Sequence, residues 1–226
     1  MRVLAIDTSA GTSVAVVENN GGSVTVLGES SVDNAMKHAE TIGSAIVDAL
    51  AQAGLTGGVS TTGRVRGIDA VVVGRGPAPF TGLRVGIAAA VMFAEGLNLP
   101  LFGVVSHDAV ALAEFERGLT LADGEELLVT SDARRSEVYW ATYQGQNENG
   151  LPIRSAGPAV QKPADLDREF ELAGRKLARA SGQVKASSIA KIFFAQQASD
   201  CTDGDVSALY LRAPDAVPTA AKKVSG

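Results

Sequence analysis

Short runs of apolar residues alternate with polar turns through the first third of the chain, a pattern typical of buried strands in an α/β protein. Residues 3–6 and 68–73 are mostly apolar and β-branched, so each is predicted to form a strand of a central sheet. Between them, strands are expected at residues 14–18 and 24–27, separated by the glycine-containing hairpin signal at residues 19–22. The pattern therefore indicates a sheet that begins at the first residues of the chain.

Two longer segments have apolar residues at three- and four-residue spacing and are predicted to be helices, at residues 35–53 and 82–97. The second is apolar nearly all round, and its small residues would let another helix approach closely. Covering both helices in a chain of this size favours a partner subunit, although packing on the chain's own sheet is the commoner arrangement. The candidate interface residues are Ile42, Ile46, Ala49, Gly86, Ala90 and Phe93.

A second strand, polar turn and strand at residues 127–143 repeat the arrangement of the first residues. We therefore predict two α/β domains, residues 1–105 and residues 106–226, the second with a mobile tail from about residue 213. The second domain is expected to contain a helix at residues 187–198 and a short strand or extended segment at residues 208–212. Between residues 150 and 186 the pattern is less periodic, and no element is predicted there.

Composition restricts the classes of function. A net charge of −5 and a pI near 5.1 argue against direct nucleic-acid binding, which needs clustered Lys and Arg. The single cysteine, Cys201, excludes an internal disulfide, and His38 and His107 are too far apart in sequence to suggest a metal cluster. With neither a signal-peptide pattern nor an uninterrupted apolar run of spanning length, we expect a cytoplasmic protein without membrane association.

The loop between the strand at residues 68–73 and the helix at residues 82–97 has the composition of an anion site. Glycines and prolines allow close backbone approach and stiffen the loop, and Thr81 is expected to cap the following helix. A rigid connection without a ligand fits the same residues. The loop is not a P-loop, because no Gly-Lys-Ser/Thr ends it.

The turn after the first strand offers related chemistry. Asp7 could present a carboxylate to a metal–phosphate complex while the Thr/Ser/Gly turn presents backbone amides to the phosphates. Alternatively, Asp7 only accepts hydrogen bonds from its own turn. The candidate nucleotide-binding residues from the two segments are Asp7, Thr8, Gly11, Gly76 and Thr81.

Four segments occur in an order that resembles the TsaB (YeaZ) family. They are Asp7-Thr8-Ser9, the Gly-Arg-Gly-Pro…Phe-Thr-Gly-Leu-Arg loop at residues 74–84, Asp-Ala-Arg-Arg…Glu-Val-Tyr at residues 132–139, and Tyr210-Leu211-Arg212. The resemblance covers residues 3 to about 212. It implies an actin-like, sugar-kinase-like (ASKHA) α/β fold of two related halves, the second reduced.

The same resemblance implies a function. The family supplies the dimerisation subunit of the complex that transfers threonylcarbamoyl to the tRNA adenosine beside the anticodon. Its partners would be a TsaD-like catalytic paralogue and a TsaE-like ATPase, with tRNA met only through the complex and a homodimer formed when the chain is alone. It implies no cofactor of the chain's own, and leaves a place for ATP or ADP at the complex interface.

The departures from the related sequences bear on catalysis. At Ala78-Pro79 the family more often has Gly-Ser, which makes a phosphate-cradling loop less favourable. Ser106 and Val110 stand where the catalytic paralogue has an HxxxH metal pair, so we expect no metal and no catalytic residues here. The alternative is an independent nucleotide-dependent phosphotransferase or ATPase using Asp7 and residues 76–81. A metalloendopeptidase is the weakest hypothesis, because paired metal ligands are missing.

Overall fold

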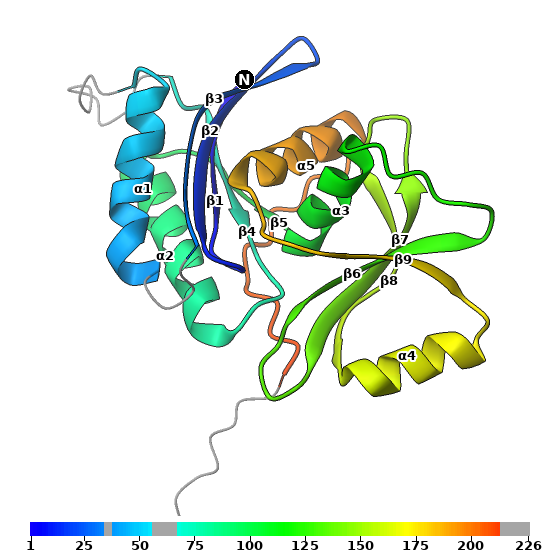
Figure 1. Cartoon of the computed structure of the whole chain (residues 1–226). Helices are drawn as coiled ribbons and strands as arrows, with labels where there is room; N and C mark the ends of the chain where they lie inside the picture. The colour runs from blue at the N-terminus through cyan, green and yellow to red at the C-terminus, as the bar shows by residue number, and fades with distance from the viewer. Residues whose placement is uncertain (34–37, 56–66, 213–226) are drawn as a thin grey trace, which may run out of the picture.

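The computed structural model describes residues 1–33, 38–55 and 67–212. Its first sheet contains β1 (Arg2–Asp7), β2 (Thr12–Asn20), β3 (Ser23–Val32), β4 (Ala70–Gly74) and β5 (Leu101–Val104), in the order β3-β2-β1-β4-β5. The first three strands form an antiparallel meander, whereas β4 and β5 run parallel to β1. This sheet is at the left of Figure 1.

The second sheet repeats that arrangement in a shorter form. It contains β6 (Glu125–Asp132), β7 (Val138–Gln146), β8 (Pro152–Gln161) and β9 (Lys176–Ser181), in the order β8-β7-β6-β9. Again an antiparallel meander is followed by a strand parallel to the first, but the described residues contain no counterpart of β5. The predicted fold class, two related α/β halves with the second reduced, is confirmed.

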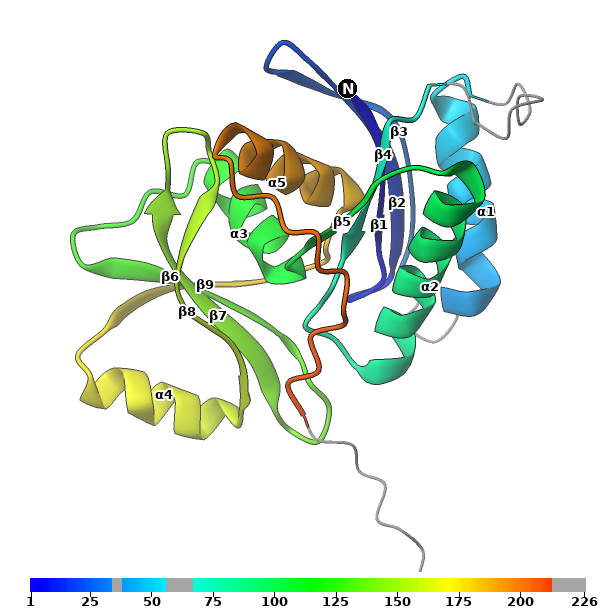
Figure 2. The same ribbon diagram turned by 180° about the vertical axis from the view of Figure 1, so that it is seen from behind.

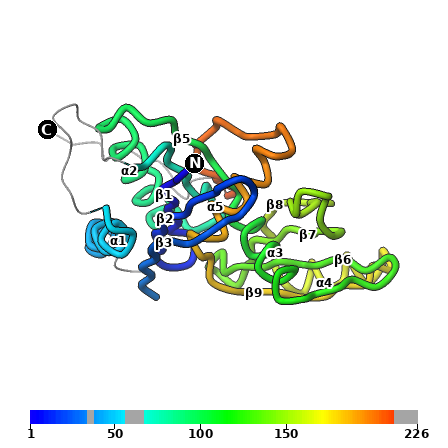
Figure 3. The backbone as a smooth tube through the Cα atoms, turned by 90° about the horizontal axis from the view of Figure 1, so that it is seen from above, coloured from blue at the N-terminus to red at the C-terminus, as the bar shows by residue number. Residues whose placement is uncertain are grey.

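In the part of the chain that the structure describes, five helices cover the faces of the two sheets. One face of the first sheet packs against α1 (His38–Gln52) and α2 (Phe80–Leu97), and the other packs against α5 (Ala186–Ala198). Next to α5 lies α3 (Ser106–Glu116), which also contacts the second sheet, and α4 (Pro163–Leu172) covers the outer face of that sheet (Figures 1 and 3). The layers therefore alternate between helices and sheets across the whole molecule.

Alternate side chains of β1 pack into the two hydrophobic cores on opposite faces of the first sheet. Val3 and Ala5 point into the core shared with α3 and α5, while Leu4 and Ile6 point into the core beneath α1 and α2. All four are fully buried. A strand covered on both faces has no polar side, which explains its continuous apolar run.

Several boundaries differ from the predictions. The third strand continues to Val32, and α2 begins at Phe80 rather than near Gly82, with Pro79 at its N-cap and no side-chain cap. Thr81 therefore lies within the first turn and does not cap the helix. The helix predicted from residue 35 is described from His38 onward, and the predicted mobile tail from residue 213 lies outside the described residues.

The less periodic region contains three elements that were not predicted, namely β8, α4 and β9. Three of the ten residues of β8 are exposed and only one is buried, and its sequence contains Gly157 and Pro158, which obscure the strand pattern. Helix α5 follows at residues 186–198, close to its predicted bounds, and packs back onto the first sheet. The domain boundary near residue 105 remains a prediction. Helix α5 belongs to the predicted second domain by sequence, but it packs on the sheet of the first.

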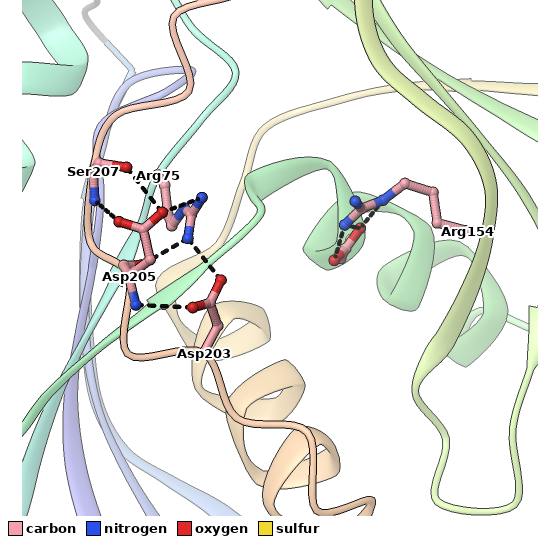
Figure 4. A network of polar contacts seen from close by, with 6 residues as sticks. Arg75, Arg154, Asp203, Asp205 and Ser207 are labelled. Carbon is pink, nitrogen blue, oxygen red and sulfur yellow. Dashed lines mark hydrogen bonds and ion pairs between the residues drawn. The ribbon is translucent and has the colours of Figure 1, made fainter.

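Residues 201–212, which we call the C-terminal strap, run extended from α5 past β5 toward the second sheet (Figure 2). Arg75 holds the strap, because its Nη1 donates to Asp203 Oδ2 and to the Asp205 carbonyl oxygen, each at 2.7 Å (Figure 4). Leu209 N in turn donates to the Arg75 carbonyl oxygen at 2.9 Å. The expected short strand at residues 208–212 is thus an extended segment without strand pairing.

In the part of the chain that is described, one helix, α2, is long and apolar enough to cross a membrane by length and composition. Here its Leu83, Gly86, Ala90, Ala94 and Leu97 are buried on one side. That side packs on β1, β4 and β5, as expected for a helix that covers a sheet.

Candidate functional site

A pocket of about 370 Å³ lies where the two halves meet. The first half contributes the turn after β1, the start of α1 and the first turn of α2, and the second half contributes the end of β6 and the turn that follows. The lining residues are Thr8, Ser9, Ala10, His38, Pro79, Phe80, Thr81, Gly82, Ser131, Asp132 and Arg134. Of the candidate nucleotide-binding residues, Thr8 and Thr81 line the pocket, whereas Asp7, Gly11 and Gly76 do not.

The Asp7 carboxylate is buried and bonded on both oxygens. Oδ1 accepts from Ser9 N at 2.8 Å and Ser9 Oγ at 2.5 Å, and Oδ2 accepts from Ser106 Oγ at 2.6 Å. Burial raises the pKa of Asp7, partly countered by the hydrogen bonds from Ser106 and Ser9. This geometry supports the alternative in which Asp7 accepts hydrogen bonds from its own turn, extended by one bond to α3.

Ser106 connects Asp7 to the glycine-proline loop. Besides donating to Asp7, Ser106 Oγ accepts from Gly76 N at 3.1 Å, and Ser106 N donates to the Gly76 carbonyl oxygen at 2.8 Å. A Cβ at Gly74 would come 1.8 Å from Asp7 Oδ2, so only glycine fits there. Gly76 therefore serves the packing of the loop, and Ser106 holds that packing together.

Thr8 faces α2 directly. Its Oγ1 donates to the Gly82 carbonyl oxygen at 2.8 Å, which fixes the first turn of the helix against the turn after β1. Gly11 adopts φ 127°, and a Cβ there would come 3.0 Å from the Val32 carbonyl oxygen. Its glycine is thus explained by backbone geometry.

His38 is a pocket residue that the sequence did not indicate as part of a site. It begins α1 and is 7% exposed, with Nδ1 3.0 Å from Thr12 Oγ1. Burial lowers the pKa of His38, which favours the neutral ring. A Cβ at Gly82 would come 2.7 Å from His38 Nε2, so this glycine and this histidine require each other. The sequence feature that could have indicated this contact is Gly82, because a glycine in the first turn of a helix leaves room for another side chain.

The turn between β6 and β7 places Arg134 at the pocket. Arg134, Arg135 and Ser136 have φ of 64°, 54° and 58°, a left-handed run that is rare for residues other than glycine. Arg134 N donates to Asp132 Oδ1 at 2.8 Å, and the two side chains form an exposed ion pair at 3.5 Å. Strained backbone of this kind is found where a side chain must be held at a site.

His107 and Asp108 lie in the core between the halves. His107 Nε2 is 2.8 Å from Ser131 Oγ, and burial, with the nearby Arg154, lowers the pKa of His107 to about 3. Asp108 accepts from Tyr143 OH at 2.7 Å and from two nitrogens of Arg154. Within the described residues no three His, Cys, Asp or Glu side chains cluster as metal ligands.

The six candidate interface residues divide into two groups. Ala49, Gly86 and Ala90 are buried within this chain, Ala49 and Ala90 at 0% exposure, so they are not surface contacts. The small size of Gly86 serves the chain's own packing, because a Cβ there would come 2.2 Å from Thr8 Oγ1. Ile42, Ile46 and Phe93 are partly exposed over the core beneath α1 and α2, and their role at an interface remains a prediction.

Comparison with known proteins gives consistent results. A family model described as "TsaD: tRNA N6-adenosine threonylcarbamoyltransferase" matches residues 26–208. An uncharacterised protein of Mycobacterium tuberculosis (strain ATCC 25618 / H37Rv) is 38% identical over 96% of this chain and 95% of its own. The tRNA threonylcarbamoyladenosine biosynthesis protein TsaB of Escherichia coli (strain K12) is 35% identical over 77% of this chain and 68% of its own.

Among solved structures, a Pseudomonas aeruginosa protein described as similar to peptidase YEAZ superposes with a TM-score of 0.68. It is 25% identical to this chain, and the match covers 93% of this chain and 99% of the other. The matched region therefore spans both sheets and the helices between them.

Proposed function

This chain belongs to the TsaB (YeaZ) family, and on that premise we propose that it is a non-catalytic dimerisation subunit in tRNA threonylcarbamoyladenosine biosynthesis. Curated members of the family carry that pathway in their names. The subunit would pair with a TsaD-like catalytic paralogue and a TsaE-like ATPase, and with a second copy of itself when alone. Contact with tRNA would come through the complex, which suits the net charge of −5.

The outer face of α1 and α2 carries this proposal. Val47 on α1 is 63% exposed and Met92 on α2 is 75% exposed, and the two helices pack side by side. Ile46 and Phe93 lie partly exposed on the same two helices. Apolar side chains exposed together on neighbouring helices mark an interaction surface more often than isolated ones do.

Two features beside the pocket favour a role without catalysis. Both oxygens of Asp7 accept hydrogen bonds from serines, and Asp7 does not line the pocket. Ser106 occupies the place of a metal-binding histidine of the paralogue and is fully buried beside Asp7. Neither feature supports the alternative of an independent phosphotransferase or ATPase. We propose that any ATP or ADP binds at the interface with the partner.

The test is association measured on charged variants. We expect Val47→Glu and Met92→Glu each to weaken binding of the TsaD-like paralogue, and self-association of the isolated chain, by at least about tenfold, since a buried unpaired charge is costly. Leu172→Glu is the matched control, because Leu172 on α4 is 83% exposed and belongs to the other half. Equal binding by all three variants would contradict this placement of the interface.

A further inference from the structure

We propose that residues 209–212, the end of the C-terminal strap, act as a latch that holds the two halves of the chain at a fixed opening. The latch contacts the start of α2 in the first half and the turn between β6 and β7 in the second. This goes beyond the proposed function, because it concerns how the halves move relative to each other and not how the chain associates. When the latch is released, the halves open about the helices that join them.

The two sheets are joined through helices. In the described part of the chain, no strand of one sheet pairs with a strand of the other. Helix α3 packs against α5 and against the second sheet, and α5 packs on the first, so the two helices lie between the sheets (Figure 1). A junction of packed helices permits one layer to rotate or slide slightly against the next. The opening between the sheets therefore depends on contacts made away from α3 and α5.

The strap begins where α5 ends and finishes beside the turn between β6 and β7 (Figures 1 and 2). Along the way it is bound to the first half. Gly103 N donates to the Asp203 carbonyl oxygen at 3.2 Å, and a Cβ at Gly103 would come 2.1 Å from the Asp205 carbonyl oxygen, so the strap fits closely against β5. Arg75 bonds both aspartates, and its carbonyl oxygen accepts from Leu209 N. The strap is thus fixed to the first half as far as Leu209.

Tyr210 anchors the end of the strap to α2. Its ring stacks on Phe80, with the ring centroids 4.5 Å apart and the planes inclined by 20°. Arg84 Nε donates to Tyr210 OH at 2.7 Å, and the Arg84 guanidinium carbon lies 5.4 Å from the centroid of Tyr210 and 5.5 Å from that of Phe80. Stacking, a hydrogen bond and cation–π contacts therefore hold one side chain, although Tyr210 is 43% exposed.

Arg212 makes the contact with the second half. Its Nη2 donates to Glu137 Oε2, and the two side chains are only 19% and 28% exposed. Glu137 closes the turn after β6, because its N donates to the Arg134 carbonyl oxygen and its own carbonyl oxygen accepts from Ala133 N, each at 3.0 Å. The ion pair thus joins the strap to a turn in which residues 134–136 are left-handed.

A direct contact between the halves near the latch is weaker. Tyr139 OH donates to the Ala78 carbonyl oxygen at 3.4 Å, which is long for a hydrogen bond from a hydroxyl. The bond from Arg212 to Glu137 joins two charged groups, and such bonds are roughly twice as strong as neutral ones. Loss of the latch should therefore loosen the angle between the halves.

The test is the distance between spin labels on the two halves of the isolated full chain. Thr25→Cys on β3 and Arg168→Cys on α4 place labels at exposed positions of opposite halves, away from α1, α2 and the strap. Cys201→Ser removes the one native thiol. The chain with its latch intact should give one narrow distance distribution, and Arg212→Ala should broaden it and shift it.

Further variants separate the latch from the ordinary loss of an ion pair. Combining Arg212→Glu with Glu137→Arg should restore the narrow distribution, since the attraction is rebuilt with the charges exchanged. Tyr210→Ala should broaden the distribution as Arg212→Ala does, because it removes the anchor on α2. Arg179→Ala is the matched control, because it breaks an ion pair with Asp167 that lies within the second half, and it should leave the distance unchanged.

Amide hydrogen exchange distinguishes a latch from a purely local contact. Arg212→Ala should speed exchange at the amides of Ala133 and Glu137 by at least about tenfold, since it removes a charged hydrogen bond that supports their turn. Faster exchange there with an unchanged distance between the labels would mean that Arg212 only stabilises the turn, and would overturn the proposal.

Two further outcomes would also overturn it. One is an unchanged distance distribution in both Arg212→Ala and Tyr210→Ala. The other is a broadening in Arg212→Ala that the exchanged ion pair leaves in place. Because neither measurement needs a partner subunit, their failure leaves the proposed function standing, and unchanged partner binding in Val47→Glu would leave the latch untouched.

Discussion

Gly86 lies directly against Thr8, so closely that a Cβ built on Gly86 would come 2.2 Å from Thr8 Oγ1. Thr8 in turn donates to the Gly82 carbonyl oxygen one turn earlier on the same helix. The pair sets how closely α2 approaches the turn after β1, and thereby shapes one wall of the pocket. Gly86 is thus a contact inside the chain, where the sequence suggested a contact between subunits.

Replacing Gly86 by Leu is therefore expected to overpack the interior, at a cost of roughly 1–3 kcal/mol in the free energy of unfolding. Urea denaturation measures it. Gly43→Ala is the matched control, because Gly43 is in the middle of α1 with nothing within 4 Å of its added Cβ. That change should stabilise the chain by up to about 1 kcal/mol. Destabilisation by both glycine substitutions would show that space at Gly86 is not the cause.

Arg75 is expected to hold the C-terminal strap. Its side chain is 9% exposed and bonds Asp203 and Asp205, whose side chains are each 51% exposed. Arg75→Ala should cost about 1–3 kcal/mol and speed cleavage within residues 201–212 by added protease. Arg117→Ala, which breaks the surface pair with Glu114, should cost less than about 1 kcal/mol and leave cleavage unchanged. Resistance to protease in the Arg75 variant would contradict this role.

His107 should make the protein less stable in acid. The folded state holds its pKa at about 3, below the ordinary value of 6.5, so between these values the unfolded chain binds the proton and the folded chain does not. Stability is therefore complete above pH 6.5 and falls as the pH is lowered, by up to about 1.4 kcal/mol per pH unit.

The measurement is urea denaturation at pH 7 and pH 5 on wild type and His107→Gln. The variant should lose about 2 kcal/mol less between the two pH values. Asp7 works in the opposite direction, because its raised pKa makes the folded state hold a proton that the unfolded state has released. Since both chains retain Asp7, its effect cancels in the comparison. An identical pH dependence in the two chains would refute the assignment to His107.

The buried cluster of Asp108, Tyr143 and Arg154 should show unequal costs. Arg154→Ala leaves the Asp108 carboxylate, whose side chain is 8% exposed, without its countercharge, and should cost about 3–5 kcal/mol. Tyr143→Phe removes one hydrogen bond to that carboxylate and should cost about 1.5–3 kcal/mol. Thermal or urea unfolding distinguishes them. A larger loss in the tyrosine variant would mean that the ion pair is not what stabilises α3 against the second sheet.

The order of motifs and the buried strands could be predicted from the sequence, because both depend on residues close together in the chain. The run from Val3 to Ile6 is apolar on both faces. The second unit of strand, polar turn and strand, at residues 127–143, indicates the second half. The same local signals indicated α1, α2 and α5 to within a few residues. They missed β8, α4 and β9, where partly exposed strands and a short helix with only Leu166 and Phe170 buried leave little periodicity.

Only the tertiary structure decided what the candidate residues do. Asp7 and Ser106 are 99 residues apart, yet a hydrogen bond joins them. Asp7, a candidate nucleotide-binding residue, is therefore part of the internal packing. His38 lines a pocket together with Gly82 and Arg134, neither of which is near it in sequence. The sequence by itself determined most of the elements and the family, since these follow from local pattern and motif order. Which side chains are bonded, buried or left open depends on contacts between distant segments, and those exist only in the folded chain.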